Sequence, residues 1–94
     1  MIFAVDFDDT LMINGEPNVR LFQVLRQQQA AGSRIILNTC RAGKRLQEAV
    51  VFCQKNGLRL NAVNDNIPET IMKLGYNPRK IFADVYIDDK AVKP

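Results

Sequence analysis

The chain contains no histidine and no tryptophan, and only two cysteines, among its 94 residues. The absence of histidine excludes catalytic triads that use a histidine base and zinc sites with histidine ligands. No apolar run approaches the roughly 20 residues of a membrane span, and residues 1–5 lack the length and basic start of a signal peptide. Without an export signal, we expect Cys40 and Cys53 to be reduced thiols. The sequence therefore predicts a soluble, cytoplasmic protein.

The length of 94 residues predicts a single domain spanning residues 1–94, with room for one hydrophobic core. No repeat, low-complexity tract or linker divides it. The net charge of +3 mildly favours anionic substrates. This bias is too small to indicate nucleic-acid binding by itself.

The first eleven residues organise the rest. An apolar run at residues 2–5 leads directly into the string DFDDTL at residues 6–11. A short apolar run without alternation is typical of a buried parallel strand. Asp6 and Asp8 then lie two apart at its tip and face the same way. Two carboxylates about 4 Å apart repel by roughly 4 kcal/mol at an effective dielectric near 20, so such acids hold a cation, share a proton or splay into solvent as an ordinary turn.

Apolar strand patterns and amphipathic helix patterns alternate along the remaining chain. The alternation predicts parallel βαβ units and an α/β fold. Ala49 and Cys53 lie on the apolar side of the second helix, which indicates a core role for Cys53. The expected strands are 2–5, 34–38, 58–63 and 81–87, and the expected helices are 17–32, 42–56 and 67–74.

The string at residues 6–11 resembles the first motif of the haloacid dehalogenase (HAD) superfamily of phosphohydrolases, usually Asp-x-Asp-Gly-Thr-Leu. Asp9 stands at the usual glycine. Two later motifs fit the same family, namely IILNT at residues 35–39 and VYIDD at residues 85–89. The family's basic residue matches Lys80 best, with Arg79 and Lys73 as competitors.

The resemblance implies a HAD-like Rossmannoid parallel sheet of about four strands in the order 4-1-2-3, with flanking helices. It also implies an aspartyl-phosphate mechanism: Asp6 as nucleophile, Asp8 as acid and base, and Lys80 as a charge clamp. Substrate binding falls to Thr39, Thr10 and Arg41. The implied cofactor is Mg²⁺, held by Asp6, Asp8, Asp88 and Asp89.

No interval between these motifs can hold a folded cap domain, so the chain looks like a capless member. The substrate stays open: a nucleotide, a sugar phosphate, a phosphoprotein or a nucleic acid, the last only through a phosphate end. Only residues 67–74 cover one face of the expected sheet. Members of the family typically continue beyond the point where this chain stops, so exposed apolar surface should favour a homodimer.

Plainer interpretations stand beside these assignments. Thr39 is equally suited to cap a helix, Lys80 taken alone is an ordinary surface lysine, and Arg41 serves equally well as a surface charge. Two other functions stay open: a receiver-like signalling module and a catalytically weak protein that binds phosphate and magnesium. A receiver carries its acceptor aspartate after the third strand, whereas residues 58–63 here run into Asn64.

Overall fold

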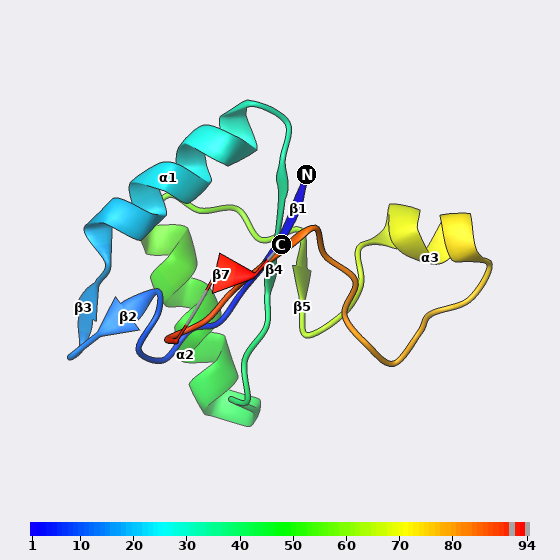
Figure 1. The fold of residues 1–94 in the computed structure, drawn as a ribbon. Helices are drawn as coiled ribbons and strands as arrows, with labels where there is room; N and C mark the ends of the chain where they lie inside the picture. Colours follow the sequence, from blue (N-terminus) through cyan, green and yellow to red (C-terminus); the bar gives the residue numbers. More distant parts are fainter. Residues whose placement is uncertain (91, 94) are drawn as a thin grey trace.

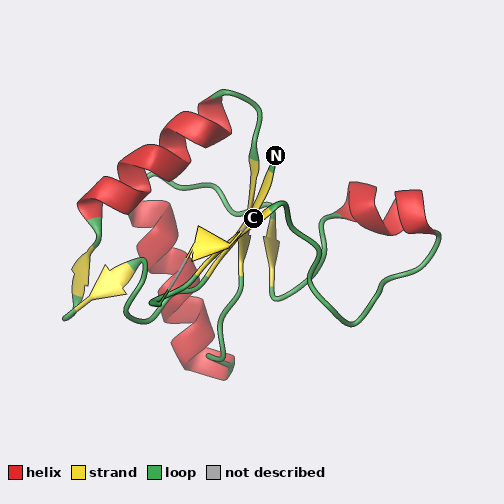
Figure 2. Cartoon of the chain, in the orientation of Figure 1, coloured by secondary structure: helices red, strands yellow, loops and turns green. Residues whose placement is uncertain are grey.

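Strands and helices alternate along the chain, as Figures 1 and 2 show. The computed structural model describes residues 1–90 and 92–93. The helices are α1 (Val19–Ala30), α2 (Gly43–Lys55) and α3 (Pro68–Leu74). The strands are β1 (Ile2–Val5), β2 (Met12–Ile13), β3 (Glu16–Pro17), β4 (Arg34–Leu37), β5 (Ala62–Val63), β6 (Val85–Ile87) and β7 (Val92–Lys93). The predicted α/β class is confirmed, and the three helices lie where the sequence placed them.

The main sheet has the order β5-β4-β1-β6-β7. Strands β5, β4, β1 and β6 run parallel, and they fall within the four segments expected as strands. The observed order differs from the expected four-stranded one by a fifth strand, β7, which pairs with β6 in the antiparallel direction. The polar acids at the tips of β1 and β6 are therefore neighbours, because these two strands pair directly.

Two strands are shorter than the sequence predicted. Strand β5, expected over residues 58–63, comprises only Ala62–Val63. Just before it, the Asn61 side chain accepts the Ile35 N–H at 2.8 Å, a hydrogen bond that a backbone carbonyl would accept in a longer strand. Strand β6, expected over residues 81–87, comprises only Val85–Ile87. Just before it, the Tyr86 hydroxyl donates to the Ile81 carbonyl and accepts the Ala83 N–H, which folds that segment into a turn.

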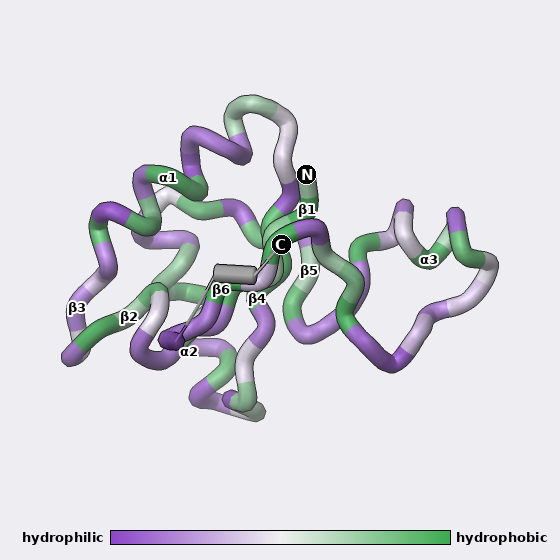
Figure 3. Tube along the Cα trace, in the orientation of Figure 1, coloured by the Kyte–Doolittle hydropathy of each residue, from purple (hydrophilic) through white to green (hydrophobic). Residues whose placement is uncertain are grey.

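The larger core lies between the sheet and helices α1 and α2. Figure 3 shows apolar chain concentrated along the central strands. The core joins β1 to Phe22 and Leu25 of α1 and to Ala49 and Cys53 of α2. Cys53 is fully buried in this core, as predicted, and burial raises the pKa of its thiol to about 12. Val24, an apolar residue of α1, lies outside this core and is 45% exposed.

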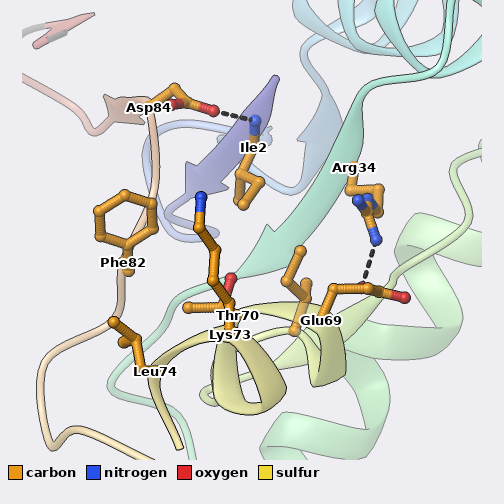
Figure 4. A pocket seen from close by; sticks show the side chains of 9 residues that line it. Ile2, Arg34, Glu69, Thr70, Lys73, Leu74, Phe82 and Asp84 are labelled. Atoms are coloured by element: carbon orange, nitrogen blue, oxygen red, sulfur yellow. Dashed lines mark hydrogen bonds and ion pairs between the residues drawn. The ribbon is translucent and has the colours of Figure 1, made fainter.

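The opposite face of the sheet is thinly covered. Among the described residues, its buried cluster comprises Ala4, Ile36, Ile67 and Ala83. Helix α3 lies on the side of the sheet away from α1 and α2 (Figure 1). Between α3 and the amino ends of β1 and β4 runs a groove of about 450 Å³, the α3 groove, which contains the Arg34–Glu69 ion pair (Figure 4). Met72, Tyr76 and Phe82 are exposed nearby along the chain. The homodimer stays a prediction.

A small hairpin, β2–β3, follows the acidic string and was not predicted. Its two-residue turn is Asn14-Gly15, with φ values of 53° and 78°. Asn-Gly with positive φ at both residues is the characteristic signal of a tight hairpin turn, so the sequence did carry the information. Asn18 then closes the loop: its side chain donates to the Thr10 carbonyl at 3.0 Å and accepts the Leu21 N–H as the cap of α1.

Asp9 occupies the position where the resembled motif usually has glycine. Its φ is 60°, in the left-handed region that glycine adopts most easily. Aspartate is one of the few other residues that enter this region at modest cost, because its short side chain can bond locally. The turn therefore keeps the backbone shape that glycine would provide.

Along the described chain, none of the helices combines the length and the hydropathy needed to traverse a lipid bilayer.

Candidate active site

The candidate site lies where β1 and β6 end. The Asp6 N–H donates to the Ile87 carbonyl at 2.9 Å, which fixes the tip of β1 against the tip of β6. Asp6, Thr39 and Asp88 line one cavity of about 320 Å³, together with Cys40. The parallel sheet thus gathers the predicted residues of three separate motifs at its carboxyl edge, which is where α/β sheets bind ligands.

The pKa of Asp6 is affected by its burial and by the neighbouring acids. Its pKa lies above the ordinary value, chiefly because it is partly buried and further because of the negative charges of Asp8, Asp89 and Asp88. A hydrogen bond from the Phe7 N–H, at 2.8 Å, opposes this rise. Asp8, Asp88 and Asp89 therefore lie close enough to Asp6 for their charges to affect it.

Asp8 is held by Arg41 in a two-pronged ion pair. The Arg41 Nε donates to Oδ2 at 3.0 Å and Nη2 donates to Oδ1 at 2.8 Å, so both carboxylate oxygens are engaged. The third nitrogen, Nη1, donates to the Arg45 carbonyl, and the guanidinium lies 4.7 Å from the centre of the Phe7 ring. These hydrogen bonds, more than the charge itself, lower the pKa of Asp8. The sequence placed Arg41 toward the substrate and did not predict this pairing.

The ion pair predicts a measurable pH dependence. In Arg41→Gln the pKa of Asp8 is expected to rise toward its ordinary value, because the charged donor is gone. A carboxyl with a lowered folded pKa stabilises the fold above its unfolded pKa, and this stabilisation is lost as the pH falls through the folded pKa. The variant should therefore be less stable than the wild type at pH 7, and the gap should close in acid.

Carboxylate ¹³C NMR of Asp8 and urea unfolding at pH 7 and pH 3 make these measurements. Arg45→Gln is the matched control, because Arg45 affects Asp8 only through its charge, as the smallest of the causes. An unchanged Asp8 pKa in Arg41→Gln would contradict the account.

Thr39 serves two purposes. Its hydroxyl accepts the Arg41 N–H at 3.2 Å, and its own N–H donates to the Asn64 side chain at 2.8 Å. Thr39 therefore orders the loop that carries Arg41 while it lines the cavity of Asp6, which agrees with the binding interpretation. The helix-capping interpretation is wrong, because the N-cap of α2 is Ala42 and no side chain caps that helix. Asn64, with φ of 51°, was not predicted as a site residue. Its position just after β5, at the same sheet edge, was the available signal.

Thr10 does not line the cavity of Asp6. It is 4% exposed, and within the described residues its hydroxyl has no hydrogen-bond partner. It lines a different hollow, next to Asp9, Asp88 and Asp89.

Of the three basic candidates, Lys73 lies apart from the neighbouring residues Arg79 and Lys80. Lys73 lines the α3 groove beside Ile2 (Figure 4), at the opposite end of β1 from Asp6. Arg79 and Lys80 are exposed in the loop that precedes β6. The Lys80 carbonyl accepts a hydrogen bond from the buried Asn66 side chain, which fixes this loop. Lys80 is not among the residues that line the cavity of Asp6, and its predicted role stays a prediction.

The donor set at the sheet edge consists of carboxylates, the oxygen ligands that magnesium prefers. Within the described residues, no three cysteine, histidine or acidic side chains converge closely enough to hold a metal ion as they stand. The pKa of Asp6 is raised chiefly by burial and secondarily by the negative charges of Asp8, Asp89 and Asp88, and a bound cation would offset these charges. In chemistry and charge, the acids fit a divalent cation.

Comparison with known proteins gives one informative similarity. A solved structure of a conserved protein from Bacteroides thetaiotaomicron matches with a TM-score of 0.81 at 35% sequence identity. The match covers 97% of this chain and 77% of that protein, which is described only as conserved. No protein-family model matches the chain. No curated protein matches it either.

Proposed function

This chain belongs to the family of the conserved Bacteroides thetaiotaomicron protein, and from the residues gathered at its candidate site we propose that it is a magnesium-dependent phosphomonoester phosphatase of the HAD type. The observation that carries the proposal is the meeting of Asp6, Asp8, Asp88 and Asp89 at one sheet edge, where their charges act on Asp6. Thr39 lines the same cavity as Asp6 and Asp88.

In the proposed reaction, Asp6 attacks the phosphorus of a phosphomonoester. The bond between phosphorus and the leaving oxygen breaks as an aspartyl phosphate forms, and water then releases inorganic phosphate from Asp6. Magnesium, which Asp6 and Asp88 would hold with support from Asp8 and Asp89, would supply positive charge that offsets the acids and attracts a phosphate oxygen. Lys80 and Thr39 are assigned to stabilise the transferring group.

Asp8 is assigned to move protons, and its contact with Arg41 limits how it can do so. A carboxylate that is engaged through both oxygens is ionised, which is the form that can take a proton from the attacking water, but its lowered pKa makes it a weaker base while Arg41 is bound. It is poorly placed to give a proton to a leaving oxygen in the first step. Leaving groups that depart without a proton should therefore react best unless Arg41 moves to the substrate phosphate.

The proposal predicts that activity depends on magnesium. Release of inorganic phosphate from a panel of phosphomonoesters is expected with magnesium, and excess EDTA should remove it by orders of magnitude, because the clustered acids repel phosphate when no cation is present. Added magnesium should restore the rate. Undiminished turnover in chelator, or no release from any ester, would contradict the proposal.

The Arg41–Asp8 pair also favours a second candidate, a phosphate-binding protein with little catalytic power. In that case the chain would bind phosphate analogues with magnesium and release no phosphate. Asn64 argues against the receiver-like function. It stands where a receiver has its acceptor aspartate, and an amide, whose oxygen here accepts the Thr39 N–H, cannot be phosphorylated as an aspartate is. The same phosphate-release assay, combined with a binding measurement, distinguishes the first candidate from the second.

A further inference from the structure

The ion pair between Arg41 and Asp8 is built more firmly than an ordinary surface pair. The edge of the guanidinium formed by Nε and Nη2 donates to both Asp8 oxygens, at 3.0 and 2.8 Å. The Arg45 carbonyl and the Phe7 ring hold the guanidinium from other sides, and the Arg41 side chain is only 11% exposed. Single-contact pairs on the surface fix little, whereas a two-pronged pair between planar groups fixes orientation. Arg41 therefore determines where the Asp8 carboxylate points.

This pair holds Asp8 beside the cavity of Asp6 and not in its wall. The charge of Asp8 acts on Asp6, so the two residues are near each other. Among the described residues, however, Asp6 lines the cavity and Asp8 does not. The expectation that both face the same way assumed an extended backbone, but the N–H groups of residues 10–12 all donate to the Phe7 carbonyl, so the chain turns there. The proton-transfer role assigned to Asp8 requires it to leave Arg41.

The backbone that carries Arg41 adjoins the same cavity. Thr39 and Cys40, which precede Arg41, line it, and the Thr39 hydroxyl accepts the Arg41 N–H at 3.2 Å. A phosphate ester offers more negative charge than a carboxylate and three acceptor oxygens, and a guanidinium binds phosphate and carboxylate through the same kind of two-pronged contact. The Nε–Nη2 edge can serve one anion at a time in this way. A phosphate at Asp6 and the Asp8 carboxylate therefore compete for Arg41.

We propose that Arg41 is a positioning residue: it keeps Asp8 out of the empty site and releases it when the substrate phosphate takes over the guanidinium. The inference rests on the proposed function, since the phosphate is that of the ester at Asp6. Release breaks the two hydrogen bonds to Asp8 and changes no covalent bond. Substrate binding thus completes the catalytic arrangement, because Asp8 becomes free to turn toward the reacting groups only once phosphate is bound.

NMR of the wild-type chain with a non-hydrolysable probe tests the exchange of partners directly. Methylphosphonate, added with magnesium at pH 7, should shift the Arg41 Nε–H signal and the carboxylate ¹³C signal of Asp8 together with the amide signal of Asp6. All three signals should report one dissociation constant. Chloride at the same ionic strength should leave the Arg41 signal in place. A titration that shifts the Asp6 signal but neither side-chain signal would overturn the positioning proposal.

A double-mutant cycle measures how strongly the pair opposes phosphate binding. In Asp8→Asn, Arg41 keeps only an uncharged partner, so methylphosphonate should bind about three- to tenfold more tightly than to the wild type at saturating magnesium. Loss of a negative charge near the anion would also tighten binding, so the same substitution is made in Arg41→Gln, where the gain should vanish. Arg45→Gln is the matched control: it removes an equal charge but keeps the backbone carbonyl that Arg41 contacts, so the gain should persist. Equal gains in all three backgrounds would reveal a charge effect alone and contradict the proposal.

The two proposals fail differently. If phosphate release depends on magnesium but the Arg41 and Asp8 side-chain signals do not respond to methylphosphonate, only the positioning proposal is wrong. If no ester releases phosphate, the proposed function is wrong and the positioning role is wrong with it.

Discussion

Asp6→Asn is expected to abolish turnover and the phosphoenzyme together, with a loss of at least about 10³-fold in rate. Asparagine keeps the size of the side chain but offers no carboxylate oxygen to attack phosphorus. The fold should survive, because the hydrogen bond between the Asp6 N–H and the Ile87 carbonyl uses only backbone atoms. Removal of charge beside three other acids should, if anything, increase stability.

Asp8→Asn should behave differently, because Asp8 is assigned to move protons and its substitution leaves the nucleophile Asp6 unchanged. With p-nitrophenyl phosphate, whose leaving group needs little protonation, this variant should release about one equivalent of nitrophenolate per site and then stall. An alkyl phosphate should give no burst with the same variant.

Asp84→Asn serves as the matched control for both substitutions. Asp84 lies in the α3 groove, where its side chain accepts the Ile2 N–H (Figure 4), so the variant should retain wild-type turnover. If Asp8→Asn slows both esters alike and excess magnesium partly restores them, Asp8 serves as a metal ligand and the proton-transfer role is wrong.

Lys80→Ala is expected to lower kcat by about 10²–10³-fold, the usual loss when a donor to developing charge is removed. Lys73→Ala should have almost no effect, because Lys73 lies in the α3 groove at the other end of the strands (Figure 4). Arg79→Ala provides a second control from the same loop as Lys80. A damaging Arg79→Ala or Lys73→Ala with a harmless Lys80→Ala would move the charge clamp to another residue.

Much of the fold could be predicted because local patterns and global architecture agree. The apolar run at β1, the spacing of Ala49 and Cys53 on α2 and the glycine after α1 each have a single local explanation. The hairpin β2–β3 was missed because the Asn14-Gly15 turn joins strands of only two residues, too short to show alternation. The strand β7 has the same property.

The candidate site could be predicted as a set of strand tips, but its internal contacts could not. The sequence indicated which acids meet, since parallel strands end at one edge. It gave no sign that Arg41 would engage Asp8, because these residues are 33 positions apart in the sequence and only the pairing of β1 with β4 brings them together. For the same reason, the unpaired hydroxyl of Thr10 is a property of the packed loop and cannot be recognised in the motif.

The central claim is that Asp6 becomes phosphorylated, and trapping the intermediate tests it most directly. The wild-type chain and Asp8→Asn are mixed with p-nitrophenyl phosphate and magnesium, quenched in acid and reduced with borohydride, which converts an aspartyl phosphate to homoserine. Peptide mass spectrometry then locates the converted residue. The account predicts homoserine at position 6, more of it in Asp8→Asn, and none in Asp6→Asn or in EDTA. Conversion at another aspartate, or turnover without any conversion in either protein, would contradict it.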